Sequence, residues 1–204
     1  MEHLSKLLGS PARTKLLRLF AFNPERVFDR DMVVRVSRIT PDTASRELAA
    51  LARAEVIKRK TYYKDVVRPG SKTAKKRKTI GWILNQNYLF IDALTRFLRD
   101  TLSISSVDVR KRLRGAGSIK LLVLSGILVG EKSGGVDMLI VGDRLNEQHV
   151  YNAVCALEAE CGQEIRYSVM TTEEYRYRRR VRDKLVRDIM DFPHHEVIDR
   201  LVNA

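Results

Sequence analysis

The sequence predicts an α+β protein of two small domains, and three observations favour this fold class. Between residues 38 and 84, a short amphipathic helix pattern is followed by two β-like runs with a basic segment between them. After residue 117, near-continuous apolar runs alternate with helical patterns, which is typical of a mixed sheet covered on both faces. The formal charge of +13 is also distributed unevenly between these two regions.

The charge surplus lies almost wholly in the first region. Residues 1–86 contain 20 Lys and Arg against 8 Asp and Glu, whereas residues 87–204 contain 18 against 17. A surplus confined to one region indicates a polyanionic partner for that region, although a solvated, flexible loop is the alternative. Its main contributors surround the basic segment: Lys58, Arg59, Lys60, Lys64, Arg68, Lys72, Lys75, Lys76, Arg77 and Lys78.

Three helices are predicted before the basic segment. Ser10, Asp29 and Thr40 are each suited to cap a helix, over residues 10–23, 29–37 and from residue 41 onward. In the third helix Pro41 occupies the first position, where its missing N–H is harmless. The core-facing spacing of Ala44, Leu48 and Leu51 leaves the other side exposed: Asp42, Thr43, Ser45, Arg46 and Ala49.

The stretches S-P-A-R-T-K-L-L-R-L-F and T-A-S-R-E-L-A-A-L-A-R-A-E-V-I resemble the winged-helix domains of bacterial and archaeal transcriptional regulators over about residues 8–86. The resemblance implies three helices and a hairpin wing, here formed by strands at 56–63 and 79–84. Ala54-Glu55 departs from the family, which often has a glycine at this corner. Some winged helices bind only protein, so the match favours a double-stranded DNA partner without excluding a protein one.

In such a domain the third helix enters the major groove, which assigns candidate DNA-binding residues. Thr43, Ser45 and Arg46 would approach base edges, with Arg46 able to bind guanine in bidentate fashion. The alternative for Arg46 is a surface ion pair with Glu47 or Asp42. The Thr40 hydroxyl and the backbone N–H groups at 41–43 could hold a phosphate, and a set of wing cations would follow the DNA backbone or minor groove. These cations are Lys72, Lys75, Lys76, Arg77 and Lys78.

The second half is predicted to begin with a connecting helix at 85–101 and a basic helix at 107–114. Buried strands within 119–126 and 136–143, a helix at 146–160 and a strand at 164–169 follow, then a basic helical stretch at 172–190 and a strand at 196–198. We therefore expect a first domain at 1–86, a connecting helix at 87–104 and a second domain at 105–204.

The segments S-G-I at 125–127 and G-G-V-D-M-L-I-V-G-D at 134–143 resemble the minimal nucleotidyltransferase fold over about residues 105–200. In active members of that family, three carboxylates hold Mg²⁺. Asp137 matches the second carboxylate, but Gly135 replaces the first. Ile127 replaces a phosphate-contacting serine, and the later strand has Arg166 and Ser168 where an aspartate is sought. The resemblance therefore implies a degenerate domain without catalysis, which we expect to be a pseudoenzyme.

Other roles stay open for this domain. Gly126, Gly130, Gly134 and Gly135 could receive the phosphates of a nucleotide near Asp137, with Lys132 or Arg166 adding charge. Equally, the glycines could only make a tight connection, with Asp137 pinning the loop through hydrogen bonds. A third alternative is a dimerisation or partner-contact platform.

Cys155 and Cys161 have no metal-ligand partners around them in the sequence, and no cofactor is expected. With no apolar run long enough for a membrane span, these thiols indicate a cytoplasmic protein. The basic stretch at 172–190 is expected to be a charged helix face. The hypothesis is thus a sequence-specific DNA-binding transcriptional regulator with a sensor or dimerisation domain, and a homodimer would suit a palindromic operator. Its alternative is a divergent, Mg²⁺-dependent nucleotidyltransferase acting on nucleic acid or protein.

Overall fold

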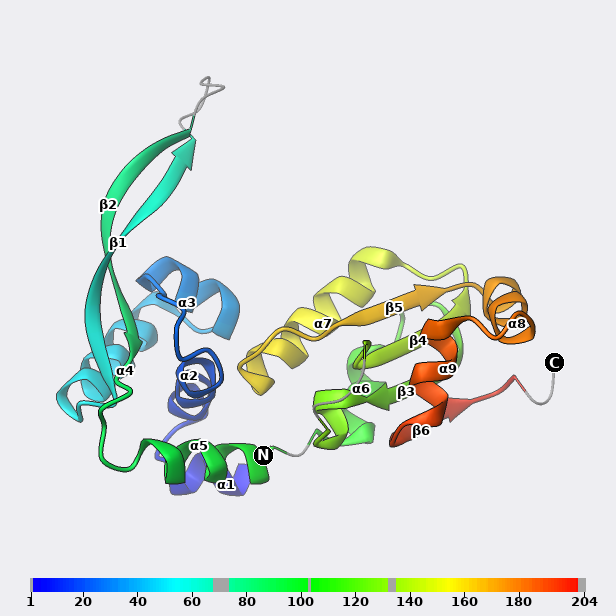
Figure 1. Cartoon of the computed structure of the whole chain (residues 1–204), viewed down its shortest axis with the longest axis horizontal. Helices are drawn as coiled ribbons and strands as arrows, with labels where there is room; N and C mark the ends of the chain where they lie inside the picture. The colour runs from blue at the N-terminus through cyan, green and yellow to red at the C-terminus, as the bar shows by residue number, and fades with distance from the viewer. Residues whose placement is uncertain (1, 68–73, 103, 132–134, 202–204) are drawn as a thin grey trace. The chain divides into compact units, whose positions relative to one another are not determined.

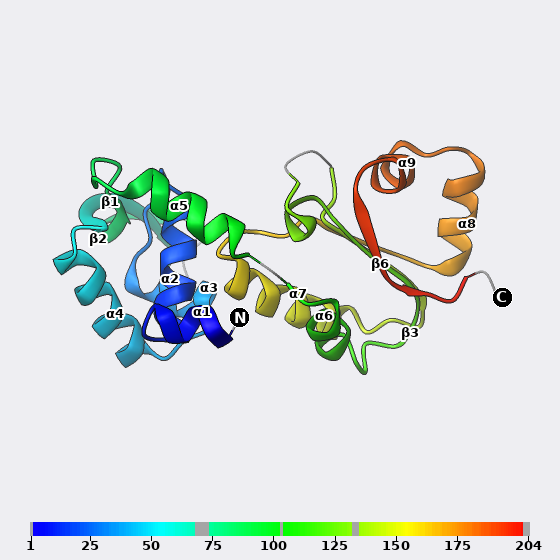
Figure 2. The same cartoon turned by 90° about the horizontal axis from the view of Figure 1, so that it is seen from below.

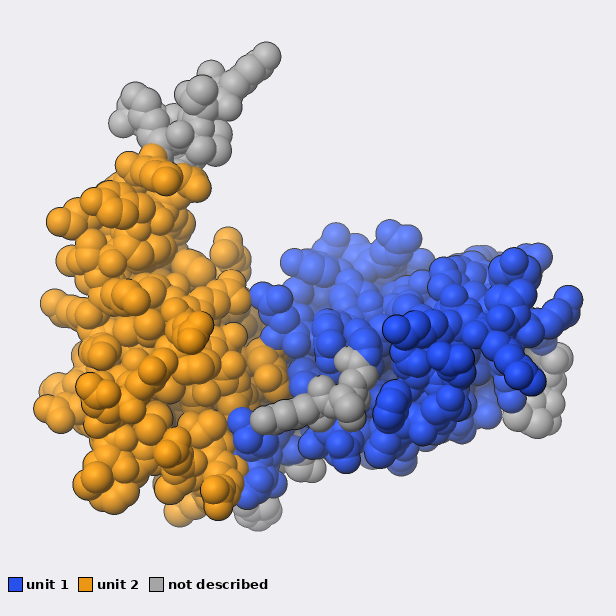
Figure 3. All heavy atoms as spheres, viewed as in Figure 1, with its two compact units in different colours: residues 1, 99–158, 164–204 blue, residues 2–98, 159–163 orange. Residues whose placement is uncertain are grey.

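The computed structural model describes residues 2–67, 74–102, 104–131 and 135–201. They form a mixed α+β structure that includes a mixed sheet. The chain divides into two compact units (Figure 3). We call Glu2–Leu98 with Ala159–Gln163 the helix–hairpin unit, and Arg99–Glu158 with Glu164–Ala204 the sheet unit. Most of the predicted connecting segment, residues 87–98, belongs to the helix–hairpin unit.

The helix–hairpin unit begins with four helices, followed by a two-stranded antiparallel hairpin and a fifth helix (Figure 1). Ser10, Asp29 and Thr40 cap α2, α3 and α4 as predicted, since each side chain accepts a hydrogen bond from the backbone N–H three residues later. The elements are α1 (Glu2–Leu7), α2 (Pro11–Phe22), α3 (Arg30–Ser37), α4 (Pro41–Arg53), β1 (Ile57–Val67), β2 (Ala74–Leu84) and α5 (Ile91–Asp100).

The core of this unit joins the helices to the base of the hairpin. Phe20 of α2 meets Phe28 edge-on, with ring centroids 5.6 Å apart. The backbones of Phe28 and Trp82 exchange two hydrogen bonds of 2.9 and 2.8 Å, which tie the segment before α3 to β2. A Cβ at Gly81 would lie 2.8 Å from the Phe28 carbonyl oxygen, so this approach requires glycine.

A short segment from far along the chain completes the helix–hairpin unit. The end of α7 (Glu147–Cys161) and the residues after it pack against α2. The buried Arg18 guanidinium donates to the Glu160 carbonyl at 3.1 Å, and Asn23 Nδ2 donates to the Gly162 carbonyl at 2.7 Å. Burial lowers the pKa of Arg18, with Cys161 and Glu160 opposing that shift.

The sheet unit contains one four-stranded mixed sheet in the order β5-β4-β3-β6. β3 pairs antiparallel with both β4 and β6, and β4 pairs parallel with β5. The strands are β3 (Ser118–Ser125), β4 (Met138–Asp143), β5 (Tyr167–Met170) and β6 (His194–Asp199). The 3-10 turn η1 (Gly126–Val129) follows β3, and the remaining helices are α6 (Ser106–Arg112), α8 (Thr172–Arg180) and α9 (Lys184–Asp191).

Both faces of the central strands are buried, which explains their near-continuous apolar sequences. Leu121, Val123, Leu139 and Val141 share a core with side chains of α8 and α9. The alternate residues are equally buried, and Figure 2 shows α6 and α7 on the opposite side of the sheet from α8 and α9. Among the described residues, no helix is long and apolar enough to cross a membrane.

Three sequence expectations need correction. The helix expected at 85–101 begins only at Ile91, because Asn85 closes the base of the hairpin through its N–H to Val56 and its side chain to Glu55. The helical stretch at 172–190 is broken into α8 and α9 at Arg182, which has a left-handed backbone with φ of 53°. The strands expected at 56–63 and 79–84 extend to Val67 and from Ala74.

Candidate nucleic-acid interface

Helix α4 exposes one side of its N-terminal half. Ala44 and Leu48 are buried against the core, whereas Ser45 and Arg46 lie exposed and Thr43 is partly covered. The position of these side chains agrees with the amphipathic pattern in the sequence. Helix α4 can therefore present Ser45 and Arg46 to a partner.

The hydroxyl groups of this half are engaged in local hydrogen bonds. The Thr40 hydroxyl donates to Thr43 Oγ1 at 2.8 Å and accepts from the Thr43 N–H at 3.3 Å. Ser45 donates to the Pro41 carbonyl at 3.0 Å. Phosphate binding by Thr40 and the Thr43 N–H would therefore require these bonds to be exchanged, which leaves Arg46 as the freest polar group.

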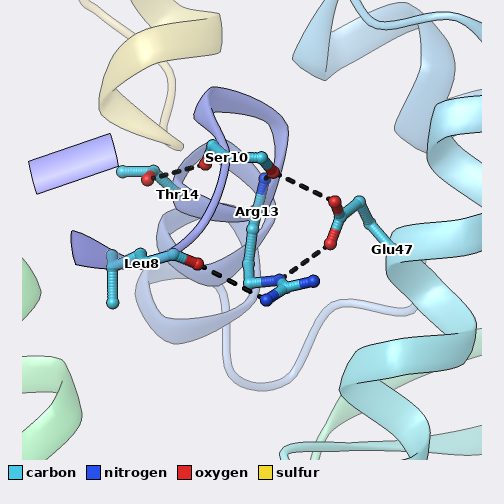
Figure 4. A network of polar contacts seen from close by, with 5 residues as sticks. All are labelled: Leu8, Ser10, Arg13, Thr14 and Glu47. Carbon is cyan, nitrogen blue, oxygen red and sulfur yellow. Dashed lines mark hydrogen bonds and ion pairs between the residues drawn. The ribbon is translucent and has the colours of Figure 1, made fainter. Parts of the chain in front are cut away.

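Glu47 fixes the rotation of α4 about its own axis (Figure 4). Its carboxylate accepts from the Ser10 hydroxyl at 3.0 Å and from Arg13 Nε at 2.8 Å, and the residue is only 4% exposed. Sequence reasoning did not assign this role, although Glu47 lies between Ala44 and Leu48 on the inner face of the helix. The predicted alternative of an Arg46–Glu47 ion pair is not formed, because Glu47 points inward to Arg13.

The hairpin carries a dense set of exposed cations beyond its buried base. Ile57, Ile83 and Leu84 anchor that base in the core. The remaining ladder continues to the pair Val67 and Ala74 and projects away from the helices (Figure 1). The exposed cations of the described part are Lys58, Arg59, Lys60, Lys76, Arg77 and Lys78.

Aromatic and apolar side chains alternate with these cations on one face. Residues at alternate positions share a face, and the register brings those of β1 opposite those of β2. Tyr63 and Ile80 have large apolar side chains, yet these are 67% and 58% exposed. The cross-strand pairs of this face are Arg59 with Trp82, Thr61 with Ile80, Tyr63 with Lys78, and Asp65 with Lys76.

The opposite face of the hairpin is bound to α3 through Asp29. The Asp29 carboxylate accepts from the Tyr62 hydroxyl at 2.6 Å and from Lys64 Nζ at 2.7 Å, while it also caps α3 through the Met32 N–H. Burial acts to raise the pKa of Asp29, but these hydrogen bonds outweigh it and lower the pKa. Burial and the bond to Asp29 raise the pKa of Tyr62 to about 12. Asp29 therefore holds the hairpin against the helices.

The predicted wing cations do not all lie in a loop. Lys75, Lys76, Arg77 and Lys78 are part of strand β2, where Lys76 pairs with Asp65 and Arg77 with Lys64. Lys72 lies outside the residues that the structure describes. Lys76, Arg77 and Lys78 thus lie on an ordered strand ladder, along the part of β2 that leads toward the hairpin tip.

In the sheet unit, Asp137 is buried and bound on both oxygens. Oδ1 accepts from the Ile127 N–H at 3.2 Å and from the Arg166 guanidinium at 3.1 Å. Oδ2 accepts from the Arg166 N–H at 2.9 Å and from Arg166 Nε at 3.1 Å. This bidentate pair raises the pKa of Arg166. The alternative in which Asp137 pins the loop by hydrogen bonds agrees with this geometry.

These residues do not fit a magnesium ion. Mg²⁺ requires free carboxylate oxygens in near-octahedral arrangement, and here a guanidinium faces both oxygens of Asp137. Within the described ranges, no group of three or more His, Cys, Asp or Glu could hold a metal ion. The Mg²⁺-dependent alternative therefore receives no support from the donor set around Asp137.

The predicted glycine site is also differently arranged. Gly126, with φ of 51°, packs directly on the Asp137 carboxylate, so a larger side chain cannot replace it. Gly130 caps η1 in a left-handed conformation, and an added Cβ on Gly130 or Gly135 would meet nothing within 4 Å. Gly134 and Lys132 lie outside the described residues. Gly126 thus serves the Asp137 contact, while Gly130 and Gly135 border open space.

Two cavities of the sheet unit lie away from these residues. One, of about 400 Å³, is lined by α7, β5 and the start of α8, and includes Arg144, Tyr167 and Thr171. The other, of about 350 Å³, lies between α8 and α9. Neither includes Asp137 or the predicted glycines. No family model, curated protein or solved structure matches this chain.

Proposed function

We propose that this protein is a sequence-specific transcriptional regulator that binds double-stranded DNA through an N-terminal winged helix. The proposal takes α2, α3 and α4 as the three helices and β1–β2 as the wing. Helix α4 would enter the major groove, where Arg46 meets a guanine, and the hairpin cations would contact phosphates. The sheet unit would be a degenerate nucleotidyltransferase-like domain that serves as sensor, dimeriser or partner platform in the cytoplasm.

The observation that carries the proposal is the combination of α4 and the β1–β2 hairpin in one unit. A solvated basic loop needs no fixed orientation, yet this hairpin is attached to α3 by Asp29 and to the core by Trp82. Cations recur on both faces of its ladder, and the exposed side chains of Tyr63 and Ile80 lie between them. Ordered cations with interspersed aromatic and apolar groups suit a nucleic-acid duplex.

Selection of bound duplexes from a random pool, followed by salt titration of the binding constant, tests the proposal. The triple variant Lys76→Gln, Arg77→Gln, Lys78→Gln should reduce the slope of log K against log salt by about 3, because each phosphate contact releases about one counterion. The control triple Lys111→Gln, Arg114→Gln, Arg180→Gln removes the same charge from exposed sites of the sheet unit and should leave the slope unchanged.

Arg46→Lys separates base recognition from charge. Lysine keeps the charge but loses the bidentate fork, so one position of the selected site should lose its preference by about 1–3 kcal/mol while the salt slope stays the same. Absent or salt-insensitive duplex binding by the wild type would overturn the proposal.

A further inference from the structure

The cavity between α8 and α9 combines a cationic rim with an apolar floor. Its volume of about 350 Å³ is at the lower end of the range for small-molecule pockets. The floor is formed by Val186, which is buried in the core of the sheet unit, and Met190, which packs against that core. The rim is formed by arginines and aspartates of the same two helices.

Two of the rim arginines have no carboxylate partner. Four arginines and two aspartates line the cavity, and Glu174 and Asp188 also pair with two of these arginines, Arg178 at 2.8 Å and Arg187 at 3.9 Å. Asp183 pairs with Arg178 at 3.5 Å, and Asp191 pairs with Arg187 at 4.0 Å. Arg178 and Arg187 are thus each paired with two carboxylates, whereas the other two lining arginines, Arg179 and Arg182, are not.

Arg179 and Arg182 form no ion pair or side-chain hydrogen bond with any residue that the structure describes. The backbone fixes their positions, since the Arg182 N–H bonds to the Arg179 carbonyl and the Asp183 N–H bonds to the Arg178 carbonyl. Arg182 has a left-handed backbone at the end of α8, where glycine or asparagine is favoured. The backbones of both arginines are therefore fixed at one corner of the chain, and their guanidinium groups have no partner among the described residues.

Two guanidinium groups without a carboxylate partner beside an apolar floor suit a ligand with negative charge and a flat apolar surface. A phosphate monoester carries a charge of about −1.5 to −2 at neutral pH, and arginine binds phosphate through paired N–H donors. A nucleobase is flat and would cover the Val186 and Met190 side chains. Both parts together have the size of a mononucleotide.

We propose that the α8–α9 cavity binds the phosphate monoester of a nucleotide, with Arg179 and Arg182 on the phosphate and the base over Val186 and Met190. Such a group occurs in a free mononucleotide and at the 5′-phosphorylated end of a nucleic acid. The proposal is independent of duplex binding by the helix–hairpin unit.

Isothermal titration of the full-length protein with AMP, GMP, CMP and UMP tests this site. Arg179→Gln and Arg182→Gln should each weaken binding about tenfold, since each removes a charge-assisted contact to phosphate. Arg180→Gln is the matched control, because Arg180 is an exposed arginine on the same helix that does not line the cavity. Met190→Ala should weaken nucleotide binding more than binding of inorganic phosphate, and circular dichroism checks that this variant is folded.

A second comparison distinguishes the two sources of the group. Short single strands that differ only in a 5′-phosphate or 5′-hydroxyl are titrated into the same proteins. A preference for the phosphorylated strand that Arg179→Gln abolishes, together with weak mononucleotide binding, assigns the cavity to nucleic-acid ends. Binding of neither probe at millimolar concentration, or equal weakening by Arg179→Gln and Arg180→Gln, overturns the proposal.

Discussion

Asp137 is a buried carboxylate whose hydrogen-bond partners all come from the chain itself. Burying an ion pair is costly, and the cost is offset only when geometry is good and every oxygen is bound. Here the bidentate Arg166 guanidinium and two backbone N–H groups meet that condition. The pair joins the residue before β4 to the residue before β5, and Asp137 also holds the turn at Gly126. Asp137 is therefore best explained as a structural residue.

Removing the arginine should show this role directly. Arg166→Met leaves the Asp137 charge buried without its counter-charge and should lower the free energy of unfolding by about 2–3 kcal/mol. This loss is below the usual cost for a fully buried pair, because the Arg166 side chain is 54% exposed. Urea denaturation followed by circular dichroism measures it.

The double variant Asp137→Asn, Arg166→Met gives the control, since it should lose less than the sum of the two single changes. Millimolar Mg²⁺ should not raise the melting temperature of the wild type. A Mg²⁺-dependent rise that disappears in Asp137→Asn would contradict the structural role and revive the enzyme hypothesis.

At the scale of elements, the hairpin depends on a contact outside its own strands. A two-stranded hairpin is marginally stable alone in water. Strands of 11 residues at about 3.3 Å per residue give the ladder a length of about 35 Å. Asp29 meets this ladder partway along it, at Tyr62 and Lys64. Beyond the Phe28–Trp82 bonds at its base, the orientation of the hairpin therefore depends on the Asp29 carboxylate.

Asp29→Asn tests the anchor while preserving the helix cap, because asparagine caps as well as aspartate. The change removes the ion pair with Lys64 and should cost about 1–2 kcal/mol, with Lys64 partly exposed. Faster amide hydrogen exchange in the distal hairpin measures it. Asp31→Asn, an exposed position on the same helix turn, is the matched control. Equal exchange in both variants would contradict the anchor.

The same contact sets a pH dependence. Hydrogen bonds lower the pKa of Asp29 in the fold, so its contribution is complete above the unfolded value of about 3.9 and disappears as the pH falls through the lower folded value. The pKa of Tyr62 is raised to about 12, so its contribution is lost only as the pH rises toward that value. Asp29→Asn should remove the loss of hairpin stability at low pH, and Tyr62→Phe should remove the loss at high pH.

Local elements were predictable from the sequence, whereas contacts between distant residues were not. The caps at Ser10, Asp29 and Thr40 and the inner face of α4 follow from patterns within one helix. The pairing of Asp137 with Arg166 joins residues 29 apart, and no local period signals it. The extra length of the hairpin strands was missed because lysine-rich segments have low intrinsic strand preference.

For the whole molecule, the division into units does not follow the order of the sequence. Residues Ala159–Gln163 belong to the helix–hairpin unit although Arg99–Glu158 of the sheet unit precede them. The buried Arg18 and the partly buried Asn23 bind this segment through its carbonyl groups. A domain boundary predicted from composition alone misses a segment that packs back on the first unit, because the hydrogen-bonded residues are 142 and 139 positions apart in the sequence.

Gly162→Ala should detach this segment from α2. Gly162 has φ of 77°, and an added Cβ would lie 2.5 Å from the Arg18 carbonyl carbon. Gly130→Ala is a matched control, since Gly130 has a similar φ of 85° but open space around it. Both changes carry the left-handed strain of about 1 kcal/mol, and only Gly162→Ala adds a backbone clash that brings the loss to about 3 kcal/mol.

Trp82 provides the measurement, because it is the only tryptophan of the chain and packs against the core of the helix–hairpin unit. In urea denaturation followed by tryptophan fluorescence, Gly162→Ala should move the midpoint to lower urea by more than Gly130→Ala does, because Gly130→Ala carries the strain alone. Equal midpoints for the two variants would mean that the packing of Ala159–Gln163 contributes nothing to the stability of the unit. The hydrogen bonds of Arg18 and Asn23 to this segment would then add no stability either.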